Sequence, residues 1–288
     1  MTILILGGNR FVGKLLAESL IKSNNKVTVF NRRGTGSKGC NIIKGDRNNL
    51  KDLEQINFND FDCVVDMCLY NLEQFKLIEP LLNKKTHYIF ISSGAAYKDP
   101  DIWPIDENNE LLGMEAYGNY GAEKAEVEKL ISQSGLTNYK ILRPTYVVGK
   151  DNHNPRLGHY IKCLQNKETI HIADNGENII SLVFAEDIVT IISLMIFNDS
   201  RGTVIDKSIE KYNICNDEFL TVNSLVNIIK NELGIKEYRI KYDSSEAILP
   251  SNNYGVFSNN KVKDSYNVRF KKLKESLPEY IEWYNKNY

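Results

Sequence analysis

The sequence predicts a doubly wound α/β fold, in which helices cover both faces of a parallel sheet, followed by a smaller C-terminal α+β lobe. Short apolar runs alternate with helical patterns through the first half, a glycine-rich turn joins the first run to the first helix, and the alternation weakens after Gly149. With 288 residues, 42% of them hydrophobic, the chain can bury a large core. We expect a sheet-bearing domain over residues 1–150 and a substrate-binding lobe over 151–288, some segments of which return to the sheet.

Six nearly continuous apolar runs are the candidate strands, since strands covered on both faces do not alternate in polarity. They are residues 3–6, 26–30, 41–44, 63–67, 88–91 and 139–142. Amphipathic spacing predicts three helices between them, over residues 12–21, 72–82 and 117–132. In the second half we expect helices over residues 158–166, 185–197, 221–233 and 270–288, and strands over 169–172, 213–215 and 239–242.

Composition argues against several classes of protein. The chain carries 36 basic and 37 acidic residues, so no general attraction draws it to nucleic acid or to an anionic membrane. No apolar run approaches the roughly 20 residues that span a bilayer, and the N-terminus lacks the pattern of a signal sequence. Five cysteines without a CxxC pair are interpreted as reduced thiols, and four scattered histidines predict no metal site. We therefore expect a cytoplasmic protein.

The turn GGNRFVG at residues 7–13 is a candidate phosphate-binding loop. Gly7 suits a tight turn, Gly13 lets the helix pack close to the sheet, and the helix start offers amide donors to a pyrophosphate. Strand-to-helix corners also need glycine for structural reasons. Arg10 stands where a middle glycine is usual, and it could cross the phosphates or point outward. The expected dinucleotide contacts are Gly7, Gly8, Asn9, Arg10, Phe11, Val12 and Gly13.

The end of the second predicted strand bears on the choice of cofactor. A carboxylate there would bind the ribose hydroxyls of NAD, but this chain has Asn31, Arg32 and Arg33. Arginine pairs bidentately with phosphate, so the sequence favours NADP over NAD, which is the alternative cofactor. The two arginines could instead be solvated side chains of a turn without any role in binding. After the third strand, Asp46 and Arg47 are further candidates, with the carboxylate near the adenine amino group.

Tyr120 and Lys124 form a YxxxK pair on a predicted helix. Residues at i and i+4 share a helix face. A nearby ammonium, together with the positive nicotinamide ring, should lower the pKa of the phenol so that it can exchange a proton with a substrate hydroxyl or carbonyl. A YxxxK pair alone is common by chance. However, the strand over 88–91 ends in Ser92 and Ser93 at the sheet edge where ligands bind. We expect Ser93 to orient the substrate oxygen and Ser92 to fix the loop.

These motifs resemble those of the extended short-chain dehydrogenase/reductases, often called NAD-dependent epimerase/dehydratases. The similarity covers nearly the whole chain through GGNRFVG (7–13), VVDMCLY (64–70), ISSGAAY (91–97), YGAEKAEVEKL (120–130), LRPTYVVG (142–149) and LVFAEDIV (182–189). The resemblance implies that Ser93, Tyr120 and Lys124 are catalytic. It also implies that Arg143 and Pro144 pass near the nicotinamide, that the region of Asp187 helps close the lobe, and that the protein forms a homodimer through the helices over 72–82 and 117–132.

Two departures from the family pattern limit the expected chemistry. Arg10 is similar to a subgroup with GGTRFxG-type loops, some members of which have lost catalysis or bind RNA. The acidic pair that sugar dehydratases carry after the catalytic serine is replaced here by Gly94, Ala95 and Ala96. Elimination chemistry therefore lacks its usual acid and base.

The sequence predicts an NAD(P)-dependent epimerase or reductase that transfers hydride at a secondary alcohol carbon of a nucleotide sugar. Arg143, Arg156 and Lys162 are candidates to contact a nucleotide diphosphate, with a structural or solvated role as the alternative for each. The competing hypothesis is a non-catalytic dinucleotide-binding protein, such as a redox sensor or an RNA-associated protein. The sequence does not reveal the substrate, because specificity resides in the lobe after Gly149.

Overall fold

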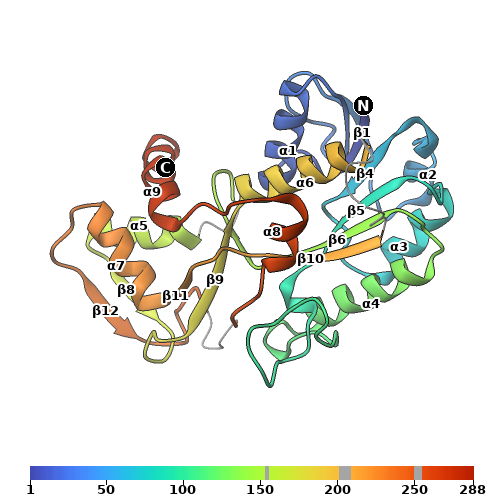
Figure 1. Cartoon of the computed structure of the whole chain (residues 1–288). Coiled ribbons are helices and arrows are strands. Elements are labelled where there is room, and N and C mark those ends of the chain that lie inside the picture. Colours follow the sequence, from blue (N-terminus) through green and yellow to red (C-terminus); the bar gives the residue numbers. More distant parts are fainter. Residues whose placement is uncertain (153–155, 201–208, 250–254) are drawn as a thin grey trace.

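The computed structural model describes residues 1–152, 156–200, 209–249 and 255–288, and His153 lies outside them. It consists of a sheet with its flanking helices and of a smaller lobe, as Figure 1 shows. All strand pairs of the seven-stranded sheet are parallel, in the order β10-β6-β5-β4-β1-β2-β3. The structure thus confirms the doubly wound α/β fold.

The strand order reverses between β1 and β4, which places the expected ligand site at the carboxyl ends of the strands near that point. The strands of this sheet are β1 (Thr2–Leu6), β2 (Lys26–Asn31), β3 (Asn41–Lys44), β4 (Cys63–Asp66), β5 (His87–Ile91), β6 (Tyr139–Pro144) and β10 (Ile209–Ile214). The first six match the predicted runs to within two residues at each end.

Helices cover both faces of the sheet, and this accounts for the continuous apolar runs. In β1, Ile3 and Ile5 pack toward α1 and α6, whereas Leu4 and Leu6 pack toward α3 and α4. One face therefore carries α1 (Phe11–Lys22) and α6 (Ala185–Ser200), and the other carries α2 (Leu50–Leu53), α3 (Leu72–Ile78) and α4 (Asn119–Gln133). Helix α4 begins two residues later than predicted, because Gly118 at φ +51° separates it from the 3₁₀ turn Glu115–Tyr117.

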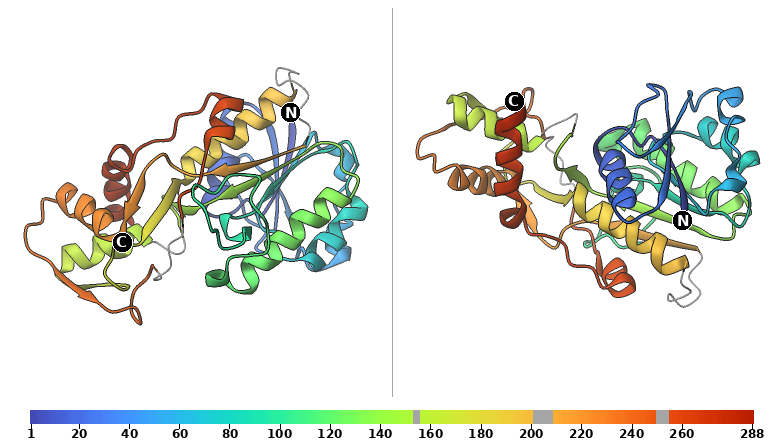
Figure 2. Two further views of the ribbon diagram at one scale, coloured as in Figure 1. Left: turned by 60° about the horizontal axis from the view of Figure 1, so that its bottom comes forward. Right: turned by 90° about the horizontal axis from the view of Figure 1, so that it is seen from above.

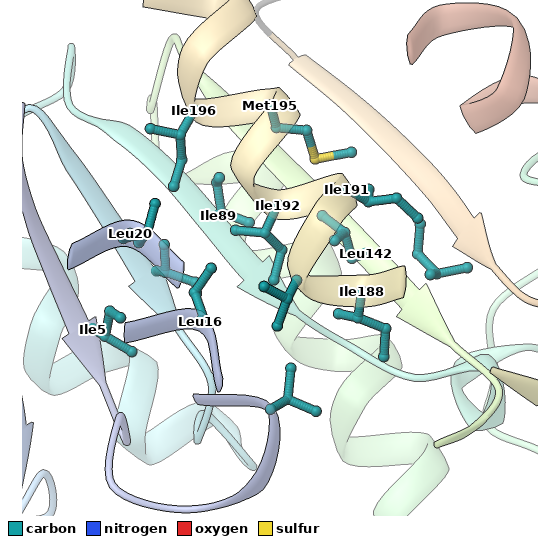
Figure 3. Packing of buried hydrophobic residues seen from close by; sticks show 14 of the residues in the cluster. Ile5, Leu16, Leu20, Ile89, Leu142, Ile188, Ile191, Ile192, Met195 and Ile196 are labelled. Carbon is teal, nitrogen blue, oxygen red and sulfur yellow. The ribbon is translucent and has the colours of Figure 1, made fainter. Parts of the chain in front are cut away.

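The sheet is completed by segments from the second half of the chain. Figure 3 shows Ile188, Ile192 and Ile196 of α6 beside Leu16 and Leu20 of α1, and all five side chains are buried. Strand β10 pairs with β6 along six residues. Without them β6 would be an open edge and one sheet face would be exposed, so the sheet-bearing part extends well beyond residue 150.

The lobe has two small sheets and three main helices. Its strands are β7 (Tyr146–Val148), β9 (Ile179–Phe184) and β11 (Phe219–Thr221) in one sheet, and β8 (Thr169–Ile172) and β12 (Arg239–Tyr242) in the other. The lobe helices are α5 (Arg156–Asn166), α7 (Val222–Glu232) and α9 (Leu273–Asn287). They lie together and apart from the main sheet, as both views in Figure 2 show. Helix α8 (Asn260–Tyr266) contacts β10. Among the described residues, no helix is both long and apolar enough to cross a membrane.

Candidate functional site

A cavity of about 510 Å³ lies between the carboxyl ends of the main strands and the lobe. Ser93 follows β5, Pro144 ends β6 and Tyr120 comes from the first turn of α4, so three elements of the main sheet layer meet there. On the sheet side the lining also includes Phe11, Gly94, Ala95, Met114 and Tyr117. The remainder comes from Thr145, Tyr146, Val147, Asn152, Arg156, Ser181 and Phe257.

Ser93 and Tyr120 come together at this cavity. Ser93 precedes the 3₁₀ turn Gly94–Ala96, and its Oγ accepts a hydrogen bond of 3.1 Å from the amide of Ala95. Tyr120 is 39% exposed, and partial burial still raises its pKa above 10.0, while a hydrogen bond with Ser93 offsets part of the rise. The two hydroxyls therefore face the same cavity. The predicted lowering of the Tyr120 pKa depends on the nicotinamide ring as well as on Lys124, and it stays a prediction.

Lys124 lies one helical turn after Tyr120, but its ammonium bonds to the backbone. Its ammonium is buried, and it donates hydrogen bonds to the carbonyl oxygens of Leu69, at 2.6 Å, and Ile91, at 2.9 Å. It lies 5.8 Å from the centre of the Tyr120 ring, so the two residues share a helix face as predicted. Burial lowers the pKa of Lys124 to about 8. The carbonyls of Leu69, three residues after β4, and of Ile91, the last residue of β5, therefore hold this ammonium.

The glycine loop at residues 7–13 is a tight turn that leads into α1. Gly7 has φ +94°, and a Cβ on Gly13 would lie 2.7 Å from the carbonyl oxygen of Gly7. A Cβ on Gly8 would lie 2.6 Å from a methyl carbon of Val29, so the strand, turn and helix approach more closely than larger residues permit. Within the described chain, no side chain caps the start of α1 and no acidic residue occupies its first turn. The positive end of the helix thus remains available to a phosphate.

The glycine loop reaches the cavity through Phe11. Arg10 is exposed and precedes α1, whereas Phe11 lines the cavity. Phe11 has φ +44°, a left-handed conformation that bulky residues rarely adopt, and such strain is concentrated at functional sites. Val12 is buried in the core beneath the loop. The side chain of Asn9 donates to the hydroxyl of Thr35 at 3.4 Å.

Arg32 and Arg33 lie exposed just after β2. The side chain of Asn31 folds back on this turn, because its Nδ2 donates to the carbonyl of Thr35 at 2.8 Å. Asn9 bonds to the hydroxyl of the same Thr35. The two arginines therefore lie within a turn that is fixed next to the glycine loop.

Arg47, a predicted cofactor contact, is paired with a carboxylate in the interior. Its guanidinium is buried and bonds to both carboxylate oxygens of Asp66, at 2.6 and 3.0 Å. Asp66 also accepts a hydrogen bond of 2.9 Å from the Tyr88 hydroxyl. Asp46 is half-buried, and one of its carboxylate oxygens accepts hydrogen bonds from Asn48. The guanidinium of Arg47 thus neutralises the buried carboxylate of Asp66 at the end of β4.

Arg143 and Pro144, predicted to pass near the nicotinamide, direct their side chains differently. Arg143 lies inside β6 with a side chain 1% exposed, and its guanidinium bonds to Glu128 and to the Tyr97 hydroxyl. Pro144 lines the cavity, but Arg143 is not among its lining residues. Because strand β6 continues through both residues, the side chain of Arg143 is directed into the interior behind the cavity.

The two other candidate phosphate ligands differ in position. Arg156 lines the cavity, and its guanidinium lies 4.7 Å from the centre of the Tyr146 ring. Lys162 is exposed one and a half turns further along α5 and is not among the lining residues. Arg156 therefore remains a candidate for a substrate phosphate, whereas Lys162 does not face the cavity.

The sequence interpretation missed the buried Glu128, which bonds to Ser92 and Arg143. A signal was present, because Tyr120, Lys124 and Glu128 follow one another at intervals of four and so share one face of α4. The lobe residues of the cavity, such as Ser181 and Phe257, had no local pattern that would predict them.

One group of potential metal ligands occurs in the lobe. Ligand atoms of His171, Asp243 and Glu246 lie within 4.8 Å of one another. However, Asp243 already accepts a hydrogen bond of 2.8 Å from the Lys241 ammonium, which neutralises its charge. None of the three residues lines the cavity.

Comparison with known proteins places these features in a family. The sequence profile of the NAD dependent epimerase/dehydratase family matches residues 3–215. A protein of Methanocaldococcus jannaschii, provisionally named a UDP-glucose 4-epimerase, is 26% identical over 316 residues, which covers 99% of each chain. The chloroplast stem-loop binding protein of 41 kDa b from Arabidopsis thaliana is 26% identical over 83% of this chain, and the match spans 65% of that protein.

Solved structures show the same fold. The UDP-glucose 4-epimerase of Thermotoga maritima, in complex with UDP-glucose, superposes with a TM-score of 0.80 at 20% identity and covers 99% of both chains. An epimerase from Thermus thermophilus, solved with NAD, superposes with a TM-score of 0.79 at 15% identity over the full length of both chains. The resemblance therefore extends through the lobe as well as the sheet.

Proposed function

This chain belongs to the NAD-dependent epimerase/dehydratase family, and on that premise we propose that it interconverts or reduces nucleotide sugars by hydride transfer at a secondary alcohol carbon. The observation that carries the proposal is the meeting of Ser93 and Tyr120 in a cavity that also reaches Phe11 of the glycine loop. A dinucleotide in the glycine cradle would place its nicotinamide end toward that cavity.

The proposed chemistry divides between the cofactor and the chain. A dinucleotide held by the glycine loop would supply the hydride chemistry at the substrate carbon. Tyr120 takes the proton from the substrate hydroxyl and gives it back, while Ser93 hydrogen-bonds the same oxygen and orients it. The buried ammonium of Lys124 lies 5.8 Å from the centre of the Tyr120 ring, and together with the bound cofactor it would favour the ionised phenol. Binding of the cofactor ribose would compete with the carbonyls of Leu69 and Ile91 for this ammonium.

Features of the cavity support an epimerase or a reductase over a dehydratase. Ser93 is followed by the 3₁₀ turn Gly94–Ala96, which carries no acid or base. Arg156 supplies a guanidinium at the lobe side, where it could pair with a substrate phosphate. The aromatic rings of Tyr117 and Tyr146 offer surfaces for an apolar sugar or base face.

Turnover of UDP-glucose tests the proposal directly. The protein is incubated with UDP-glucose and either NAD⁺ or NADP⁺, and the nucleotide sugars are separated by anion-exchange chromatography while absorbance at about 340 nm follows the nicotinamide. An epimer that forms without net cofactor reduction indicates an epimerase, and net oxidation or reduction indicates a reductase. Failure to bind either dinucleotide would overturn both.

We further propose that NADP(H) is the preferred cofactor. Replacing Arg32 and Arg33 together with alanine is expected to weaken NADPH binding by about 10- to 100-fold, because two charge-assisted contacts to the 2′-phosphate are lost. NADH binding should change little. Calorimetric titrations of wild type and variant with both dinucleotides measure this, and the variant Arg239→Ala, in the lobe, is the matched control. NAD-selective binding that the substitutions do not affect would make NAD the cofactor.

A second candidate function follows from one relative. The Arabidopsis protein is named as a stem-loop binding protein, so a dinucleotide-binding protein that associates with RNA is the alternative. Binding of a stem-loop RNA that weakens steeply with salt, in a protein without turnover, would favour it. The near-neutral charge of the chain argues for the enzyme instead.

Two expectations from the sequence stay predictions. Cytoplasmic location is one. Dimerisation through α3 and α4 is the other, and the outward residues Glu123, Glu126 and Lys129 of α4 are exposed, so such an interface would be polar. Sedimentation velocity would measure the oligomeric state.

A further inference from the structure

Three residues on one face of α4 lie opposite three consecutive residues at the end of β5. Tyr120 and Ser93 line the same cavity, and Lys124 donates to the carbonyl of Ile91 at 2.9 Å. Glu128 accepts a hydrogen bond of 2.5 Å from the hydroxyl of Ser92. The helix and the strand end are therefore in register over two turns. Sliding α4 along its axis would break the hydrogen bonds of Lys124 and Glu128 together and would move Tyr120 away from Ser93.

The contact at Glu128 differs from the other two because it is charged, multiple and fully enclosed. The carboxylate is 0% exposed and accepts three hydrogen bonds from Arg143, two from Nε at 3.0 and 3.1 Å and one from Nη2 at 2.6 Å. Bidentate guanidinium–carboxylate pairs fix distance and direction together. Buried ion pairs contribute little net stability, and their better-supported use is to specify one arrangement over its alternatives.

Arg143 extends this pair to the far side of Ser93. Its Nη1 donates to the Tyr97 hydroxyl at 2.6 Å, and Tyr97 in turn donates to Asn213 of β10 at 2.7 Å. Tyr97 follows the 3₁₀ turn that begins after Ser93. The short segment that carries Ser93 is therefore held at both ends, at Ser92 by Glu128 and at Tyr97 by Arg143.

We infer that the buried Glu128–Arg143 ion pair is a positioning device that holds Ser93 and Tyr120 together at the cavity, although neither of its members lines it. Glu128 fixes α4, which carries Tyr120, and Arg143 fixes the segment that carries Ser93. The role in turnover rests on the proposed function, whereas the geometric coupling to Tyr120 does not.

Substitutions separate positioning from mere stability. Glu128→Gln leaves a buried guanidinium without its counter-charge and is expected to destabilise the fold. The double variant Glu128→Leu/Arg143→Met removes both charges, so the fold should keep a melting temperature near that of the wild type. Glu126→Gln, at an exposed position of the same helix, is the matched control.

Turnover and tyrosine titration are the two measurements. With UDP-glucose as the probe, the double variant should lose about 10- to 100-fold in kcat with an unchanged dissociation constant for NADPH, as expected for displaced catalytic groups. Titration of ¹³C-labelled tyrosine in the NADP⁺-bound protein, with Tyr120 assigned through Tyr120→Phe, follows the second effect. Without the Ser93 hydrogen bond the pKa of Tyr120 should rise, since that bond lowers it.

The outcomes distinguish the two proposals. A folded double variant with wild-type kcat and an unshifted Tyr120 titration would overturn the positioning role. If the wild type itself turns over no UDP-glucose, the proposed activity on that substrate fails, and the Tyr120 titration alone decides the positioning role. A shift of Tyr120 in the double variant but not in Glu126→Gln would then support it.

Discussion

Replacing Tyr120 with phenylalanine is expected to lower the turnover of a nucleotide sugar by about 10²- to 10⁴-fold, the contribution of a positioned proton donor and acceptor. The substitution removes one hydroxyl and keeps the aromatic ring. Tyr120 lines the cavity and is 39% exposed. Stability and dinucleotide affinity should therefore stay at wild-type values. Initial rates, with dinucleotide binding measured on the same preparation, give the result.

The matched control is Tyr242→Phe, which removes the hydroxyl of an exposed tyrosine in the lobe. It should leave the rate unchanged. If Tyr120→Phe keeps full turnover on an identified substrate, another group carries the proton and the proposed mechanism fails. An equal loss in both variants would indicate a general effect of the substitution.

Replacing Asp66 with asparagine should cost about 3–5 kcal/mol of unfolding free energy, the largest loss of stability that we expect from a single substitution. Asp66 is 0% exposed and is the counter-charge of Arg47, whose side chain is 7% exposed. The Tyr88 hydroxyl donates to the same carboxylate. The variant leaves a guanidinium buried and unneutralised at the end of β4.

Urea unfolding of wild type and variant measures this difference. Asp60→Asn, at an exposed position three residues before β4, is the control. It should change the free energy of unfolding by less than about 0.5 kcal/mol. The double variant Asp66→Leu/Arg47→Met should recover much of the loss, because it removes both charges together. A change below about 1 kcal/mol for Asp66→Asn would show that water or a rearranged side chain reaches Arg47.

The fold and the core of the candidate site were predictable because both rest on local patterns. Strands buried on both faces are continuous apolar runs, and the YxxxK spacing brings Tyr120 and Lys124 to one helix face. The missed strand β9 illustrates the limit. Its apolar run ends at Phe184 and α6 begins at Ala185, so no polar turn separated strand from helix in the sequence.

Charged residues were harder to interpret than apolar ones. Arg47 and Arg143 were expected at the cofactor, but each lies buried against a carboxylate distant in sequence, Asp66 and Glu128 respectively. Local sequence does not show which charge will meet which, because the pairing arises from strands and helices that come together only in the folded chain. Arg156, close to the start of a lobe helix, does line the cavity.

The path of the chain between the two parts constrains how this protein can diversify. It leaves the sheet after β6, returns through α6 and β10, enters the lobe again at β11, and passes beside β10 at α8 before ending in α9. The lobe is thus a set of insertions threaded through the sheet layer rather than a module joined at one point. New substrate preferences would arise by remodelling these inserted loops one at a time, since exchanging the lobe as a block would remove α6 and β10 from the core that supports the catalytic helix.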